Sequence, residues 1–287
     1  MRKLVRRFLK FVNPEFHAKQ RYFQRLGHWP NFVDPHSYNE KINYRKFHGK
    51  RNSTFVTCSD KLAVRQWISE RIGNDYLVPL LYSGESISKE KLSELGKGIV
   101  VKTTHDSGSV YIVGENSPPT PKDIVAGINK SLAHDFGRSV SEWWYSAIPR
   151  RVIVEKLLVS QAGAPPDDYK FHVFRRKTGI VVILQMDFDR HSEHTRSFYD
   201  EELSLLDISK KMTNTHFEWN SPPKNYEEML HIAKRLGGEF DYARVDLYNV
   251  DGAVYFGEIT FAPAGGFGRF SPDNIDIKWG ELWEQSA

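Results

Sequence analysis

Residues 242–260 read YARVDLYNVDGAVYFGEIT, and this is the most informative stretch of the 287-residue sequence. β-branched and aromatic residues run through both halves, and an Asn-Val-Asp-Gly turn separates them, so the stretch predicts an antiparallel hairpin. Alternate residues of a strand face the same side, so Arg244 and Asp246 share one face, and Glu258 and Thr260 share one face of the second strand. Pairing across the hairpin is expected to bring Asp246 and Glu258 close together.

Two carboxylates on one face repel each other unless a cation lies between them. Arg244 supplies part of that positive charge, and a magnesium ion could supply the rest. Hard oxygen ligands such as Asp246 and Glu258 suit Mg²⁺ that bridges nucleotide phosphates. The alternative for these residues taken alone is a structural salt bridge with solvated carboxylates.

A second hairpin is expected over residues 99–113, where two β-branched runs flank a polar loop. Lys102 ends the first run, and the loop contains Ser107, Gly108 and Ser109. Glycine lets backbone N–H groups approach phosphate oxygens and lysine adds positive charge, so this segment could cradle a phosphate. A solvent-facing hairpin lysine is the alternative, and the spacing is not that of a Walker loop.

The remaining pattern is that of an α+β protein with prominent antiparallel hairpins. Helices are expected from Ser37, after Ser59 or Asp60, over 122–134 and over 225–236, where Asn225 and Glu228 fit a capping box. Strands are expected over 76–82, 151–158, 169–174 and 180–186.

The charge balance and the cysteine content limit the expected partners and the expected location of the protein. The 40 Lys and Arg residues nearly balance 36 Asp and Glu residues, so nucleic acid is not an expected partner. Cys58 is the single cysteine, which excludes an internal disulfide and fits a reducing cytoplasm. Residues 2–12 would form a helix with one apolar and one basic face, which suits the surface of an anionic membrane. A terminal helix packed on its own domain is the alternative.

The order of these motifs resembles that of the ATP-grasp ligases, and more closely the TupA-like branch, named for teichuronopeptide biosynthesis. The resemblance extends from about residue 38 to near the end of the chain. It is carried by Tyr38-Asn39-Glu40-Lys41, Asp60-Lys61, His105-Asp106-Ser107-Gly108-Ser109, Tyr169-Lys170-Phe171, Arg244-Val245-Asp246-Leu247-Tyr248 and Phe256-Gly257-Glu258-Ile259-Thr260-Phe261.

This resemblance implies an ATP-grasp fold, in which two α/β lobes with antiparallel sheets hold ATP between them, preceded by a helical N-terminal segment. The units would be 1–55, 56–97, 98–155 and 156–287. The implied activity is that of an ATP-dependent ligase that forms an amide through an acyl phosphate. It would join an amino acid or small amine to a uronic acid of a cell-surface or capsular polysaccharide, in the cytoplasm or at the inner face of the membrane.

The resemblance also implies roles for individual residues. Lys61, Lys102 and Lys170 would hold phosphates, and Arg244 would stabilise an oxyanion. Thr260 stands where the wider superfamily has Asn and is a weaker Mg²⁺ ligand. Adenine would be held by Glu155, Lys156, Leu157 and Leu158.

The acidic substrate needs a cationic site, and the residues expected to supply it are Arg190, His191, His194 and Arg196. A solvated loop is the alternative for this cluster, and a metal site is disfavoured because no third ligand is evident. Backbone N–H groups of Gly265 and Gly266 could assist, or form an ordinary turn. His105 is a candidate proton acceptor for the amine, or it orders the loop.

Three rival functions remain open from the sequence. Asp187-Phe188-Asp189 has the acidic spacing that glycosyltransferases use to bind a metal and a sugar nucleotide. A sugar or lipid kinase would share ATP, Mg²⁺ and the lysines. A polysaccharide-binding scaffold with a degenerate nucleotide site is the third.

Overall fold

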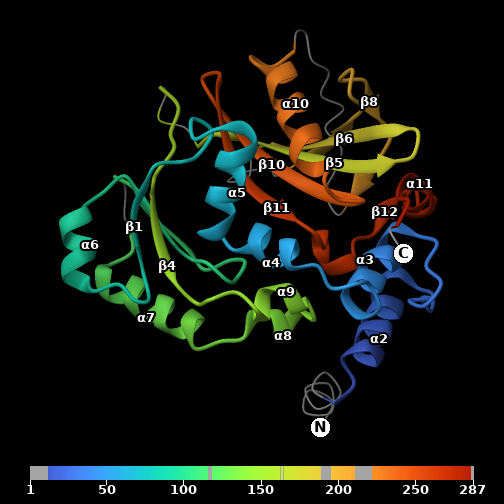
Figure 1. The fold of residues 1–287 in the computed structure, drawn as a ribbon, viewed down its shortest axis with the longest axis horizontal. Helices are drawn as coiled ribbons and strands as arrows, with labels where there is room; N and C mark the ends of the chain where they lie inside the picture. The colour runs from blue at the N-terminus through green and yellow to red at the C-terminus, as the bar shows by residue number, and fades with distance from the viewer. Residues whose placement is uncertain are drawn as a thin grey trace.

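The computed structural model describes residues 12–115, 118–161, 163, 165–188, 195–210 and 222–285, and within them a small and a large antiparallel sheet (Figure 1). The small sheet has the strand order β1-β4-β2-β3, and the large sheet has the order β11-β10-β5-β6-β7-β8. A further pair, β12-β9, is two-stranded. This architecture confirms the predicted α+β class with antiparallel sheets.

The bounds of the elements follow the chain. The strands are β1 (Leu80–Gly84), β2 (Ile99–Thr103), β3 (Val110–Val113), β4 (Val152–Lys156), β5 (Asp167–Arg176), β6 (Gly179–Phe188), β7 (Thr195–Tyr199), β8 (Leu205–Leu206), β9 (Ser209–Lys210), β10 (Tyr242–Val250), β11 (Ala253–Thr260) and β12 (Phe270–Ser271). The helices are α2 (Pro14–Leu26), α3 (Tyr38–Phe47), α4 (Ser53–Ser59), α5 (Ala63–Ile72), α6 (Lys89–Leu95), α7 (Pro121–Leu132), α8 (Phe136–Val140), α9 (Trp143–Ser146), α10 (Tyr226–Gly237), α11 (Ile275–Leu282) and the short 3₁₀ turn η1 (Pro263–Gly266).

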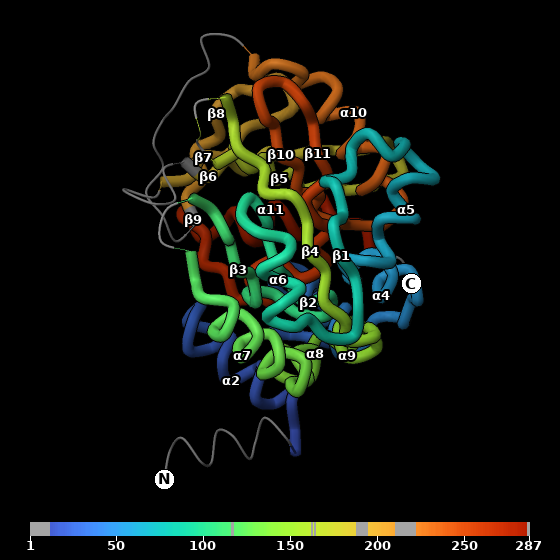
Figure 2. The backbone as a smooth tube through the Cα atoms, turned by 90° about the vertical axis from the view of Figure 1, so that its left-hand side faces the viewer, coloured from blue at the N-terminus to red at the C-terminus, as the bar shows by residue number. Residues whose placement is uncertain are grey.

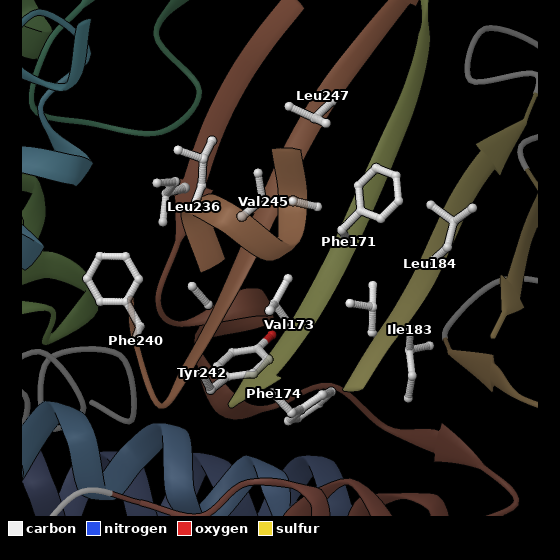
Figure 3. Packing of buried hydrophobic residues seen from close by; sticks show 14 of the residues in the cluster. Phe171, Val173, Phe174, Ile183, Leu184, Leu236, Phe240, Tyr242, Val245 and Leu247 are labelled. Carbon is white, nitrogen blue, oxygen red and sulfur yellow. The ribbon is translucent and has the colours of Figure 1, made fainter. Parts of the chain in front are cut away.

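The large sheet has one apolar face, which α10 covers by packing on β5 and β10 (Figure 3). Phe171, Val173 and Val245 on that face are fully buried. The helix lies so close that a Cβ atom at Gly237 would meet the Cβ atom of Val173 at 2.6 Å. Alternation along the strands therefore leaves the residues between these on the opposite face, where Arg244 and Asp246 lie.

The small sheet has a hydrophobic core of its own, formed with α6 and α7 (Figure 2). Val101 and Val154 of the sheet pack with Ile124 and Ile128 of α7 in this core. Strand β1 comes from the predicted unit 56–97, whereas β2 and β3 come from the predicted unit 98–155. Strand pairing therefore joins residues of these two units in one sheet.

The helical N-terminal segment is tied to the C-terminal segment through α3. The predicted helix start at Ser37 is confirmed, and Ser37 forms a capping box with Glu40. Lys41 donates hydrogen bonds to the backbone oxygens of Gly280 (2.9 Å) and Trp283 (2.7 Å). The Tyr38–Lys41 motif thus connects the two ends of the described chain.

Two local predictions were wrong. Asn225 caps α10 in a left-handed conformation (φ 59°) without a capping hydrogen bond from its side chain, which donates to the Gly252 oxygen instead. Glu228 does not close a capping box, but accepts a hydrogen bond from the Tyr76 hydroxyl at 2.7 Å. The strand expected from Tyr76 begins at Leu80.

Among the helices that the structure describes, none has both the length and the apolar character needed to cross a bilayer.

Candidate functional site

The hairpin of β10 and β11 places its polar residues in register. Arg244 pairs with Thr260 and Asp246 pairs with Glu258, which confirms the predicted pairing. The guanidinium of Arg244 donates two hydrogen bonds to Asp246, from Nε to Oδ1 at 2.7 Å and from Nη2 to Oδ2 at 2.6 Å. The same Nη2 lies 3.1 Å from Glu258 Oε1 and 3.1 Å from Thr260 Oγ1. Arg244 therefore joins all three predicted metal ligands.

The two carboxylates of this hairpin have pKa values shifted in opposite directions. Burial raises the pKa of Asp246 to about 7, because the loss of solvation outweighs the attraction of Arg244. Burial also disfavours ionised Glu258, but Arg244 and Lys61 more than offset it and lower the pKa of this carboxyl. The side chain of Glu258 is 50% exposed, so a cation from solution can reach it. Two carboxylates and a hydroxyl are hard oxygen donors, and this set fits Mg²⁺.

The polar row continues across the large sheet. Lys170 of β5 pairs with Asp246 in register and forms ion pairs with Asp168 and, at 3.1 Å, with Asp187. Arg196 of β7 donates to Asp187 at 2.5 Å. Although burial acts the other way, Arg196 and Lys170 hold the pKa of Asp187 well below its usual range. Lys170 thus belongs to a buried ion-pair network beside the hairpin.

Lys61 connects the hairpin to the small sheet. It follows Asp60, whose Oδ1 accepts the N–H of Leu62 at 2.8 Å and so fixes the turn into α5. The ammonium of Lys61 donates to the backbone oxygen of Asp106. Burial lowers its pKa, and Glu258 and Asp106 oppose that shift. Lys61 is therefore within electrostatic reach of the metal hairpin and of the predicted phosphate loop.

Lys102 is held by an acidic partner on the neighbouring strand. Its Nζ lies 2.8 Å from Glu155 Oε2, and Arg65 of α5 lies 3.0 Å from Glu155 Oε1. Lys102 also acts on the pKa of Lys61, so the two predicted phosphate lysines lie within electrostatic reach of each other. The sequence reasoning missed Arg65, because nothing in its local pattern indicates a partner so far along the chain.

The predicted phosphate loop is ordered by one carboxylate. Asp106 accepts hydrogen bonds from Thr103 (2.6 Å), Ser109 and Ser131, and these hydroxyls lower its pKa although burial opposes them. Ser107 and Gly108 at the tip are exposed. Gly108 has a φ of 108°, which side-chain-bearing residues rarely adopt. The loop therefore has a fixed base and an accessible tip.

His105 belongs to the first part of this loop and is only 1% exposed. Its Nε2 is 3.2 Å from the Ser131 oxygen and 3.3 Å from the His134 oxygen. Burial lowers the pKa of His105. Of the two roles considered, this position favours ordering of the loop over proton transfer to a substrate.

The predicted adenine segment begins at the end of β4, an interior strand of the small sheet, and continues beyond it. Lys156 N–H donates to the Pro79 oxygen at 3.0 Å and Leu157 N–H donates to the Gly98 oxygen at 2.8 Å. The Leu158 N–H has no hydrogen-bond acceptor among the described residues. Leu158 is thus the residue of this segment whose backbone donor is available to a ligand.

The two predicted glycines lie in the turn η1, directly after the metal hairpin. Gly265 (φ 65°) donates its N–H to the Ala262 oxygen, so this donor is used within the turn. Its own oxygen accepts from Lys46 Nζ at 3.0 Å. A Cβ atom on Gly266 would meet Asn43 Nδ2 at 2.4 Å, so α3 packs tightly against this glycine.

Other predicted substrate residues lie outside the described residues, namely Arg190, His191 and His194, as do Asp189 and residues 1–11. Two surface cavities of about 430 and 610 Å³ meet at Arg51 and are not lined by any predicted site residue. Within the described ranges, no cluster of three His, Cys, Asp or Glu side chains could hold a metal. A metal here would rely on Asp246 and Glu258 with a hydroxyl and ligands from outside the chain.

Comparison with known proteins places these residues in a family. A model described as TupA-like ATP-grasp matches residues 40–284. No curated protein matches the sequence. One similar solved structure is D-alanine-D-alanine ligase from Helicobacter pylori, at 14% identity, covering 87% of this chain and 69% of that one, with a TM-score of 0.45.

Two more solved structures are similar, again at low sequence identity. The D-alanine–D-alanine ligase from Bacillus anthracis complexed with ATP is 16% identical, covering 71% of this chain and 54% of that one, with a TM-score of 0.38. The N5-carboxyaminoimidazole ribonucleotide synthetase from Thermus thermophilus is 12% identical, covering 85% of this chain and 51% of that one, with a TM-score of 0.39. This chain thus spans about half the length of these two enzymes, and the family model alone assigns it.

Proposed function

The chain belongs to the TupA-like ATP-grasp family, and on that premise we propose that it is an ADP-forming ligase that joins a carboxylate to an amine. The observation that supports this most is the hairpin on which Arg244 joins Asp246, Glu258 and Thr260. Lys61 lies within electrostatic reach of this hairpin and of Lys102, as phosphate binding would require.

The proposed reaction has two steps. The substrate carboxylate attacks the γ-phosphorus of ATP, and ADP leaves. The neutral amine nitrogen then attacks the acyl carbon, the C–O bond to phosphate breaks, inorganic phosphate leaves, and the nitrogen gives up one proton to become the amide nitrogen.

The residues of the site would divide this work. Lys61 and Lys102 would bind phosphate oxygens, and the exposed loop tip at Gly108 would offer backbone N–H groups. Asp246 and Glu258, with the Thr260 hydroxyl, would hold Mg²⁺, which when bound supplies positive charge against the phosphates. Arg244 would stabilise the oxyanion that forms when the amine attacks.

For the substrates, we propose a uronic acid of a polysaccharide or its precursor as the carboxylate and an amino acid or small amine as the nucleophile. Arg190, His191 and His194 remain the predicted anion-binding residues. The guanidinium of Arg196, by contrast, is engaged by Asp187. Asp187, which the glycosyltransferase alternative would use, is paired with Lys170 and Arg196 as Asp246 is with Arg244, so ion pairing does not decide between the two functions.

A screen of amines crossed with uronates, with ADP release as the first readout and mass spectrometry as the second, tests the proposal. We expect ADP and phosphate to form only when ATP, Mg²⁺, an amine and a uronate are all present, with a product lighter than the two substrates by one water. A product that retains phosphate would identify a kinase instead. Thermal protection by UDP-sugars, without protection by ATP and Mg²⁺, would favour the glycosyltransferase.

We also propose peripheral contact with the anionic inner face of the membrane. Phe16 and Phe23 lie seven residues apart on one face of α2 and are 41% and 42% exposed. Trp29 stacks on Phe23 with ring centroids 5.1 Å apart and is itself exposed. These side chains extend the apolar pattern of residues 2–12 along the chain, and basic residues interleave with that pattern.

Deletion of residues 1–12 combined with Phe23→Ser is expected to abolish sedimentation with phosphatidylserine vesicles. The wild type should bind such vesicles weakly and should lose this binding at high salt. It should not bind phosphatidylcholine vesicles, because the attraction comes from the basic face of the helix. Ile277→Ser, which removes an exposed apolar side chain of α11, is the matched control and should bind normally. Unchanged sedimentation of the truncated variant would refute the membrane role.

A further inference from the structure

Two surface cavities away from the predicted site share one arginine in their walls. The first, of about 430 Å³, lies between the end of α3, the start of α4, the end of β5 and the turn before β10. The second, of about 610 Å³, lies between the start of α2, the end of α3, α8 and α9 (Figure 1). Arg51, in the connection from α3 to α4, lines both. Each volume is within the range of small-molecule sites, so the two together can take a ligand of several units.

The acidic residues in the wall of the first cavity already have cationic partners. Asp241 is paired with Arg45, which is only 5% exposed. Glu239 accepts hydrogen bonds from Arg71 at 2.5 and 3.0 Å. Each carboxylate therefore has its own arginine, and the other charged residues of this wall are all basic.

These other basic residues are Lys50, Arg51 and Arg175. All three are exposed, and none of them forms an ion pair with a carboxylate in the part of the chain that the structure describes. The guanidinium of Arg51 instead lies over the ring of Trp143, 5.4 Å from its centroid. Like charges around one hollow repel each other and attract an anion, so the first cavity is suited to a ligand with several negative charges.

The second cavity continues the same chemistry. Its cations are Arg51 and Arg138, and Trp143 adds an aromatic ring to its wall. The carboxylate of its wall, Asp135, caps α8 and accepts hydrogen bonds from the Arg138 N–H at 2.9 Å and from Ser146 Oγ at 2.7 Å. Arg51 thus stands between two cavities that both offer positive charge.

Uncharged polar groups in the first cavity favour a saccharide as the anion. Asn52 Oδ1 accepts the N–H of Thr54 at 2.9 Å, and Gln285 Nε2 donates to the Lys41 oxygen at 3.1 Å. Among the described residues, this leaves the Asn52 amide as a donor and Gln285 Oε1 as an acceptor for a ligand. Sugar hydroxyls use both donors and acceptors, whereas phosphate oxygens use donors only. The net charge of +4 is also small for a protein that binds nucleic acid.

The first cavity adjoins the end of the metal hairpin. Phe55 in its wall stacks on Phe261 with ring centroids 4.2 Å apart, and Phe261 directly follows Thr260. Asp241, also in the wall, precedes Arg244 by three residues, which is roughly 10 Å along an extended strand. A chain-like ligand with one unit at the hairpin therefore needs only a short further length to reach the cavity.

We propose that the two cavities, joined at Arg51, bind a segment of an acidic oligosaccharide. Lys50, Arg51 and Arg175 hold its carboxylates, and the chain continues past Trp143 towards Arg138. This inference rests on the ligase function proposed above and states that the carboxylate substrate is a chain, of which the cavities hold the units that do not react. The N-terminal segment is a poor alternative occupant, because residues 2–10 carry five basic side chains and the cavities repel them.

Calorimetric titration of the full-length protein with galacturonic acid and its oligomers of two to six units, without nucleotide, tests this site. We expect the affinity to rise about tenfold from the monomer to the trimer and to fall with salt, because further carboxylates reach further cations. Neutral maltose oligomers of the same lengths should not bind. Failure of every galacturonate oligomer to bind, or tighter binding of a single-stranded DNA hexamer, would overturn the proposal.

A double variant locates the site. Lys50→Gln combined with Arg175→Gln should weaken binding of the hexamer about a hundredfold, since each lost charged contact is expected to cost about tenfold. Both residues are exposed, so the variant should melt as the wild type does. Lys130→Gln combined with Arg235→Gln removes the same two charges from exposed positions of α7 and α10 and is the matched control. Equal loss of affinity in both double variants would show attraction by net charge alone and would refute the assignment.

The second cavity has a test of its own. Arg138→Gln should weaken binding of the hexamer about tenfold and leave binding of the dimer unchanged, because only the longer chain extends past Arg51. Unchanged affinity for the hexamer would contradict a site that continues through both cavities.

Thermal protection by a non-hydrolysable ATP analogue, measured on the same proteins, separates this inference from the function on which it rests. If the analogue protects the wild type and the Lys50→Gln, Arg175→Gln variant while no oligomer binds, the ligase proposal stands and the saccharide site does not. If the oligomers bind as expected and the analogue gives no protection, the site stands and the ligase proposal fails.

Discussion

Asp246→Asn is expected to lower the rate of ADP formation about a thousandfold and to remove the Mg²⁺-dependent part of the thermal protection by a non-hydrolysable ATP analogue. Asparagine keeps the size of the side chain and can still accept one hydrogen bond from Arg244, so the fold should stand. It removes one of the two negative charges on the hairpin, and the guanidinium at 2.6 Å then repels an incoming cation. Losing the metal's charge against the phosphates would cost about 4 kcal/mol of transition-state stabilisation, and each 1.4 kcal/mol is about tenfold in rate.

The matched control is Asp273→Asn, because the Asp273 side chain is 77% exposed and its ion pair, with Arg269 four residues earlier, lies on the surface. It should keep full activity and full protection by the nucleotide. Undiminished Mg²⁺-dependent ADP formation by Asp246→Asn would show that the hairpin carboxylate does not hold the metal. Function that survives both Asp246→Asn and Glu258→Gln would instead favour a scaffold with a degenerate nucleotide site.

The hairpin could be predicted because its information is local. A period of two decides which side chains of each strand share a face. The register set by the turn shifts between Asp246 and Leu247, and this irregularity, which was not predicted, sets Asp246 opposite Glu258. Strands β5 and β6 were predictable for the same reason, whereas the pairing of β5 with β10, far along the chain, was not predicted. The family resemblance added a further kind of information, the order of the motifs along the chain, which cannot be read from any single strand.

Partners far apart in the chain could not be predicted. Arg65 and Lys102 meet on Glu155, and Thr103 and Ser131 meet on Asp106, without any signal in the intervening sequence. The charge of such residues is visible in the sequence, but their partners are visible only in the fold.

The capping prediction at Asn225 failed for the same physical reason. The local pattern offered Glu228 as a reciprocal partner, but tertiary contacts supplied better ones. Glu228 accepts from Tyr76 at 2.7 Å, and the Asn225 amide donates to the turn of the last hairpin at Gly252. α10 is therefore anchored at its start by β-hairpin and loop contacts rather than by its own first turn.

A second large effect is expected on stability, from Arg45→Met. Arg45 is 5% exposed, donates to the Phe261 oxygen at 3.0 Å, forms an ion pair with Asp241, and stacks over the Trp283 ring at 4.3 Å. Methionine would fill much of the volume but remove the guanidinium that pairs with the carboxylate of Asp241. Removing one partner of a buried ion pair costs about 3–5 kcal/mol, so the free energy of unfolding measured in urea should fall by that amount.

Two further variants test the cause of that loss. Arg269→Met removes an exposed arginine and should change the free energy of unfolding by less than about 0.5 kcal/mol. Adding Asp241→Asn to Arg45→Met should restore part of the lost stability, because the cost arises from an uncompensated carboxylate and not from packing alone. Equal stability of the single and double variants would assign the loss to the aromatic stacking instead. Phe261 directly follows Thr260, so Arg45 also ties the end of the metal hairpin to α3, and a loosened Phe261 should weaken nucleotide protection in the single variant.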